Sequence, residues 1–155
     1  MNLKFTVPGR PQPAGSKRGF PLRLPGGKVR VIITDANLEA KPWQAEVRYA
    51  ALVAYRGEAW SGPLRLTLRF FLTRPKGHFG KKGVRASAPK HPTVKPDALK
   101  LARAVEDACT GILWLDDAQI VEEHLSKEYG PQDGCVVEVE EIKSGLAALL
   151  EEEAS

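Results

Sequence analysis

Hydrophobic and polar positions alternate in several segments of the chain, and this alternation predicts strands. Residues 3–7 (LKFTV) and 28–34 (KVRVIIT) are rich in apolar and β-branched side chains, as strands are. Residues 63–73 (PLRLTLRFFLT) alternate leucine with arginine or threonine before two phenylalanines, which favours a strand with one face in water. Residues 118–129 and 134–142 predict two further strands, joined as a hairpin across the turn YGPQDG.

A helical period replaces the alternation in three other segments. In residues 38–57 apolar side chains recur at helical spacing, and Gly57 suits the end of that helix. Residues 97–110 predict a second helix, which Gly111 would stop. A short acidic amphipathic helix, SGLAALLEEEA, closes the chain.

The order of these elements, β-β-α-β-α-β-β-α, predicts an α+β fold in which helices pack on a mixed β-sheet. A length of 155 residues suits one domain, so we expect residues 1–155 to form a single unit. Two segments rich in proline, glycine and basic residues, about 8–27 and 74–96, are predicted to be basic loops.

Charge is distributed unevenly along the chain. Residues 59–96 contain no acid, whereas residues 116–155 contain twelve acids and two lysines. This asymmetry predicts a polyanionic partner on one face, although a solvated basic loop without a partner would show it too. The basic side chains expected to contact nucleic-acid phosphates are Lys17, Arg18, Lys76, Lys81, Lys82 and Lys95.

Cysteine usage and hydropathy bear on the compartment. Cys109 and Cys135 lack metal-binding spacing and are expected to be buried free thiols, which fits a reducing environment. We predict no membrane partner, because no apolar run is long enough to span a bilayer. The N-terminus predicts a strand rather than a signal peptide, so a cytoplasmic location is expected.

Carboxylates occur where the second helix begins and where the strand after it begins. Asp97 stands at the first position, and Asp116 and Asp117 stand at the second. If the fold brings them together beside a basic groove, they could bind Mg²⁺, with Mn²⁺ as a substitute, and support phosphodiester hydrolysis. Simpler explanations exist: Asp97 could merely cap the helix, and paired aspartates are common in turns.

The helix from Asp97 has a clear buried face and a clear polar face. At 100° per residue the apolar stripe contains Ala98, Leu101, Val105, Ala108 and Cys109. Leu99 lies instead on the flank of the polar side, beside Arg103 and Glu106. Asp107 is four residues after Arg103 and could pair with it. The core therefore does not require a leucine at position 99.

Residues 95–122, KPDALKLARAVEDACTG–ILWLDDAQIVE, resemble the RusA family of Holliday-junction resolvases, and PAGSKR near the N-terminus resembles phage-type members. The resemblance implies a homodimeric, Mg²⁺-dependent endodeoxyribonuclease that resolves four-way DNA junctions by paired nicks in DNA recombination and repair. By position, it implies catalytic roles for Asp97, Arg103 and Asp117. Asp107 and Asp116 match further family acids.

Leu99 departs from this pattern, because it stands where the family has its second metal-binding aspartate. Three explanations stay open: a protein that binds branched DNA without cutting it, replacement by a neighbouring acid, or an introduced change. The neighbouring acids that could replace the missing aspartate are Glu106, Asp107 and Asp116. A separate alternative is a domain that binds RNA or protein nonspecifically through its basic loops.

Overall fold

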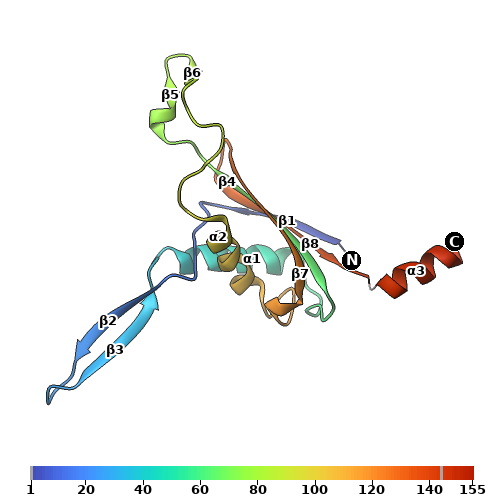
Figure 1. The fold of residues 1–155 in the computed structure, drawn as a ribbon, viewed down its shortest axis with the longest axis horizontal. Coiled ribbons are helices and arrows are strands. Elements are labelled where there is room, and N and C mark those ends of the chain that lie inside the picture. The colour runs from blue at the N-terminus through green and yellow to red at the C-terminus, as the bar shows by residue number, and fades with distance from the viewer. Residues whose placement is uncertain (1, 144) are drawn as a thin grey trace.

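A four-stranded mixed sheet forms the centre of the molecule (Figure 1). The structure is a computed structural model that describes residues 2–143 and 145–155. The strand order is β1-β8-β4-β7, in which β4 runs parallel to β7 and antiparallel to β8, and β8 runs antiparallel to β1. These strands are β1 (Asn2–Pro8), β4 (Leu64–Leu72), β7 (Ile120–Tyr129) and β8 (Gly134–Glu141). The predicted α+β class is confirmed.

The predicted hairpin between the last two strands is wrong, because β4 lies between β7 and β8. Two strand spacings amount to about 10 Å, which the four residues 130–133 can bridge. Hydrogen bonds hold the link against the end of β4: Gly130 N donates to Leu72 O at 3.0 Å, and Thr73 N donates to Asp133 Oδ1 at 2.7 Å. The apolar strand β4 thereby gains a partner on each side.

Two helices cover one face of the sheet (Figure 1). They are α1 (Ala40–Ala54) and α2 (Ala98–Cys109), and they pack against each other as well as against the strands. The third helix, α3 (Gly145–Ala154), extends from the body; the predicted helix began at Ser144, which lies outside the described residues. No helix in the described ranges is long and apolar enough to cross a membrane.

The core lies between the helices and the sheet. Leu66, Leu68 and Phe70 of β4 point into it, while Arg65 and Arg69 on the opposite face form ion pairs with glutamates of neighbouring strands. The predicted strand with one wet face is therefore confirmed. The prediction that both cysteines are buried free thiols is also confirmed.

Both predicted basic loops contain strands. Residues 17–23 form β2 (Lys17–Arg23), which pairs with β3 (Val29–Asp35) as a two-stranded ribbon that projects from the body (Figure 1). Pro21 and Gly19 hide this strand in the sequence, because both residues are rare in strands that have neighbours on both sides, but a ribbon has free edges. The second segment holds a 3₁₀ turn, η1 (Lys76–His78), and a small hairpin of β5 (Phe79–Gly80) and β6 (Gly83–Val84).

Candidate functional site

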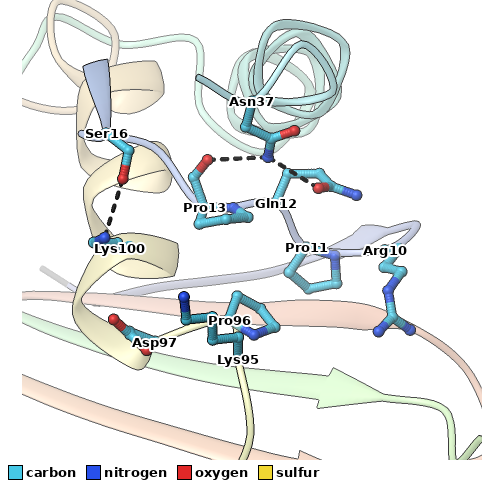
Figure 2. A pocket seen from close by; sticks show the side chains of 10 residues that line it. All are labelled: Arg10, Pro11, Gln12, Pro13, Ser16, Asn37, Lys95, Pro96, Asp97 and Lys100. Carbon is cyan, nitrogen blue, oxygen red and sulfur yellow. Dashed lines mark hydrogen bonds between the residues drawn. The ribbon is translucent and has the colours of Figure 1, made fainter. Parts of the chain in front are cut away.

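Asp97 lies at the beginning of α2, in the wall of a pocket of about 360 Å³ (Figure 2). It occupies the N-cap position, but its carboxylate accepts no capping hydrogen bond. Capping alone therefore does not account for this aspartate. The residues lining the pocket are Arg10, Pro11, Gln12, Pro13, Ser16, Asn37, Lys95, Pro96, Asp97 and Lys100.

Hydrogen bonds fix the PAGSKR segment to the first turn of α2. Ala14 N donates to Lys100 O at 2.9 Å, and Lys100 Nζ donates to Ser16 Oγ at 3.0 Å. On the other wall, Asn37 Nδ2 donates to Pro13 O at 3.2 Å (Figure 2). The pocket thus has ordered walls. Three basic side chains and one carboxylate line it, which suits an anionic ligand such as a phosphate.

The DDAQ motif after α2 forms a short 3₁₀ turn, η2 (Asp117–Gln119). Asp116 caps it by accepting a hydrogen bond from Ala118 N at 2.8 Å, and Gln119 Oε1 accepts one from Asp116 N at 2.9 Å. Gln119 Nε2 also donates to Trp60 O at 2.8 Å and so ties the turn to the core. Asp116 and Gln119 therefore build the turn, and this leaves Asp117 as the motif's candidate for chemistry.

Three carboxylates from different elements gather near the C-terminal half of α2. Glu106 of α2 shares a hydrogen bond with Glu123 of β7, and the charge of Asp117 also acts on it. Burial, followed by the hydrogen bond and the repulsion from these two neighbours, raises the pKa of Glu106 to about 8. Arg103 opposes this rise. At neutral pH the group thus holds a proton that an isolated glutamate would release.

The remaining predicted residues of α2 lie on its polar face. Arg103 pairs with Asp107 at 3.3 Å, as the sequence suggested. Leu99 is 73% exposed, which confirms that the core does not need it. Glu106 follows Leu99 by seven residues, which is about two helical turns, so both lie on the same face of α2.

The structure does not place the three predicted metal ligands as one group. Asp97 precedes Glu106 by nine residues, which corresponds to about 13 Å along the helix axis, whereas the charge of Asp117 acts on Glu106. Asp116 is engaged in its cap. Within the part of the chain that the structure describes, no three His, Cys, Asp or Glu side chains are already arranged to hold a metal ion.

Glu123 is the site residue that sequence reasoning missed. It shares a strand face with Leu125, which packs against the core, so the alternation in β7 signals an acid that faces the helices. A charged side chain on the inner face of an edge strand is a recognisable signal. The sequence could not show that this acid meets Glu106, because that contact depends on how α2 packs on β7.

The predicted phosphate-binding residues lie in three places: the β2–β3 ribbon, a second projection formed by η1, β5 and β6, and the pocket. Lys17 and Arg18 lie in the β2–β3 ribbon, where Lys17 pairs with Asp35 and the Arg18 guanidinium lies 5.5 Å from the centre of the Phe20 ring. Lys95 lines the pocket beside Asp97. The two projections point in different directions from the body (Figure 1). The exposed lysines near the second projection are Lys76, Lys81 and Lys82.

Comparison with known proteins gives the family. The model of a family described as endodeoxyribonuclease RusA matches residues 8–140. The chain is also similar to YqaN of Bacillus subtilis (strain 168), an uncharacterized protein: the two are 30% identical over 148 aligned residues, and the match covers 92% of this chain and 98% of YqaN. The range matched by the family model includes both walls of the pocket, all of α2 and the DDAQ turn. The chain therefore belongs to the RusA endodeoxyribonuclease family.

Proposed function

We propose that the protein is a Mg²⁺-dependent endodeoxyribonuclease that resolves four-way DNA junctions in recombination and repair. It acts as a homodimer in which each subunit nicks one strand, and Mn²⁺ can replace Mg²⁺. The observation that carries the proposal is the group of Glu106, Asp117 and Glu123 beside Arg103, on the helix that also lines the basic pocket. The family match over residues 8–140 supports the same activity.

The donor chemistry of this acid group suits a hard divalent cation. Mg²⁺ takes oxygen ligands and is held by one or two carboxylates together with water and substrate phosphate. The raised pKa of Glu106 reflects burial and negative charge that no neighbouring cation balances fully. When bound, the ion supplies an activated water and neutralises phosphate charge. The carboxylates of Asp117 and Glu106 would hold it, once Glu106 has released its proton.

Glu106 is the best replacement for the aspartate that Leu99 displaces. It stands on the same helix face as Leu99 and lies near Asp117. The other two candidates are already engaged: Asp107 pairs with Arg103, and Asp116 caps the DDAQ turn. The acid is thus shifted about two turns along α2 rather than lost.

The remaining predicted residues have proposed roles around this centre. Arg103 would stabilise the charge that develops on the phosphate during cleavage. Lys95 and Lys100 would bind the phosphates of the DNA backbone in the pocket of Figure 2. The Asp97 carboxylate would help to orient that backbone through a bridging water molecule or a second cation. The other basic residues would contact phosphates and position the junction without reading its sequence; they are Lys17, Arg18, Lys76, Lys81 and Lys82.

Cleavage of a synthetic four-way junction in Mg²⁺ tests the proposal. We expect Asp117→Asn and Glu106→Gln each to reduce the cleavage rate by at least about 100-fold, because each removes a ligand charge. Leu99→Ala is the matched control on the same helix face and should cut like the wild type. Absence of cutting by the wild type in both Mg²⁺ and Mn²⁺ would contradict the proposal, and normal cutting by Glu106→Gln would contradict the role of Glu106.

A second candidate function is binding of branched DNA without cleavage. It is favoured by Leu99, which offers no ligand oxygen although its side chain is exposed on the site's face of α2. This candidate predicts binding of the junction that weakens with salt, without products. Under it, Leu99→Asp should switch cleavage on.

A further inference from the structure

A second pocket, of about 500 Å³, lies where β4 and β7 end and the β5–β6 hairpin begins. Its lining contains two aromatic side chains, a valine, a proline and one arginine. The residues that line it are Thr73, Arg74, Phe79, Val84, Tyr129, Gly130 and Pro131. The acid group of Glu106, Asp117 and Glu123 contributes none of them, so this pocket is separate from the proposed catalytic centre.

The β5–β6 hairpin presents two apolar side chains to this pocket. Phe79 and Val84 are opposite each other in the hairpin register, so their side chains lie on the same face. Hydrogen bonds fix the hairpin: Arg85 N donates to His78 O at 2.8 Å, and Arg85 Nε donates to Phe79 O at 3.0 Å. Phe79 is 46% exposed and Val84 is 50% exposed. An ordered apolar surface is therefore left open to a ligand.

The opposite wall combines an aromatic ring with a fixed positive charge. The Arg74 guanidinium carbon lies 4.3 Å from the centre of the Tyr129 ring, which is a cation–π contact. Arg74 Nη1 donates to Pro89 O at 2.7 Å, and Arg74 Nη2 donates to Lys90 O at 3.4 Å. Both acceptors are neutral carbonyls, so these hydrogen bonds hold the guanidinium in place and leave its charge available to an anionic ligand.

The surrounding charge selects a nucleotide as the occupant. Lys81 and Lys82 form the exposed turn between β5 and β6, and residues 59–96 contain no acid. Protein sites that hold single strands combine aromatic side chains, on which bases stack, with cations that follow the phosphates. The pocket and the hairpin tip supply both parts. A segment of another protein would have to be strongly acidic to match the same tip.

Only an unpaired base can enter such a pocket, because the faces of paired bases are covered by their neighbours in the duplex. Extruding a base requires the least energy where it is mismatched or already unpaired. A branched DNA interrupts the stacking of the duplex and so offers such bases near the branch. Tyr129 follows Glu123 by six residues of β7, or about 20 Å, which equals about six steps of one DNA strand. One branched substrate is therefore long enough to reach both sites.

We propose that this pocket binds one unpaired nucleobase of branched DNA, stacked on the Phe79 ring beside Tyr129 and Arg74, while Lys81 and Lys82 hold the flanking phosphates. The assignment rests on the proposed function, because it names the structural feature of the substrate that the protein holds outside its catalytic centre.

Equilibrium binding in a chelating buffer tests this site without cleavage. Three otherwise identical duplexes are compared: one with a single bulged thymidine, one with a bulged abasic nucleotide, and one fully paired. Stacking of a base on an aromatic side chain has a typical energy that corresponds to roughly a tenfold change in affinity. We expect the wild type to bind the bulged thymidine about tenfold more tightly than the abasic bulge.

Substitutions of Phe79 assign this preference to the pocket. Phe79→Ala should reduce the ratio of the two affinities to below about twofold, whereas Phe79→Trp should retain it, because a larger ring still stacks. Phe20→Ala is the matched control: Phe20 is also 46% exposed and also lies beside an arginine, but in the β2–β3 ribbon. Its ratio should equal that of the wild type. Circular dichroism checks that each variant is folded.

Photocrosslinking locates the bound base. With 5-iodo-2′-deoxyuridine as the bulged nucleotide, irradiation and peptide mass spectrometry should attach the base to Phe79 or Tyr129. Equal wild-type affinity for the thymidine and abasic bulges would overturn the proposal and leave the pocket to a protein partner. A preference that survives Phe79→Ala, or crosslinks confined to the β2–β3 ribbon, would also overturn it. Failure of the proposed function has a different result, because the wild type would then bind none of the three DNAs or would cut no junction in Mg²⁺.

Discussion

Glu106 ties the stability of the protein to pH. Its pKa is 4.5 in an unperturbed chain and about 8 in the folded protein, chiefly because the carboxyl is buried and next because it is hydrogen-bonded to Glu123. Between those pH values the folded state holds a proton that the unfolded state has released. The free energy of unfolding therefore contains a contribution from Glu106 that is full below about pH 4.5 and falls as pH rises toward about 8.

Urea denaturation from pH 5 to pH 9 in a chelating buffer checks this dependence. In Glu106→Gln the free energy of unfolding should lose the part of its pH dependence that comes from this carboxyl group. The variant should also be more stable than the wild type above pH 8, because the amide never carries the charge. The measurement needs no DNA and no metal. If wild type and Glu106→Gln give parallel stability profiles, the raised pKa is contradicted.

At the scale of an element, helix α2 has one face that packs in the core and an opposite face that carries the candidate site residues. Leu101 is fully buried, whereas Leu99, two residues earlier, is 73% exposed. Leu101→Ala should lower the free energy of unfolding by about 2–5 kcal/mol, because it leaves a cavity in the core. Leu99→Ala should change it by no more than about 0.5 kcal/mol. Equal losses in urea titrations would mean that Leu99 has a packing role.

The lysines at the tip of the η1–β5–β6 projection are expected to act through charge alone. Lys81→Gln and Lys82→Gln should each weaken junction binding and reduce the slope of log K against log salt by about one unit. Lys143→Gln is the matched control, since Lys143 pairs with Glu151 of α3, a helix that lies apart from β5 and β6 in Figure 1. Titrations from 50 to 200 mM salt measure the slope, and slopes that stay unchanged in Lys81→Gln and Lys82→Gln would remove this projection from the DNA interface.

At the scale of the whole molecule, the proposed homodimer predicts bilateral cutting. A supercoiled plasmid that carries a cruciform should become linear when both strands are cut in one encounter, and nicked when only one is. We expect the wild type to give mainly linear product, because each of the two proposed subunits cuts one strand. Mainly nicked circles from the wild type would contradict paired cutting.

The elements that the sequence predicted well are those with a local period. The alternation of β4 and the apolar stripe of α2 each follow from burying one face, so the strand and the helix were predictable almost to their ends. The strand β2 was missed because Pro21 and Gly19 disrupt the local signal. The hairpin of β7 and β8 was predicted wrongly because strand pairing depends on the rest of the sheet, and β4 competes successfully for both partners.

The sequence by itself determined the family motif, the asymmetry of charge and the fact that Leu99 is not needed by the core. Only the tertiary structure decided which acids meet: packing of α2 on β7 brings Glu106 to Glu123 and Asp117, while the length of the helix separates Asp97 from them. It also assigned Asp116 and Gln119 to the construction of a turn. The physical reason is that residue chemistry and periodicity are local, whereas a shared proton or ion requires side chains a few ångströms apart that come from segments distant in the chain.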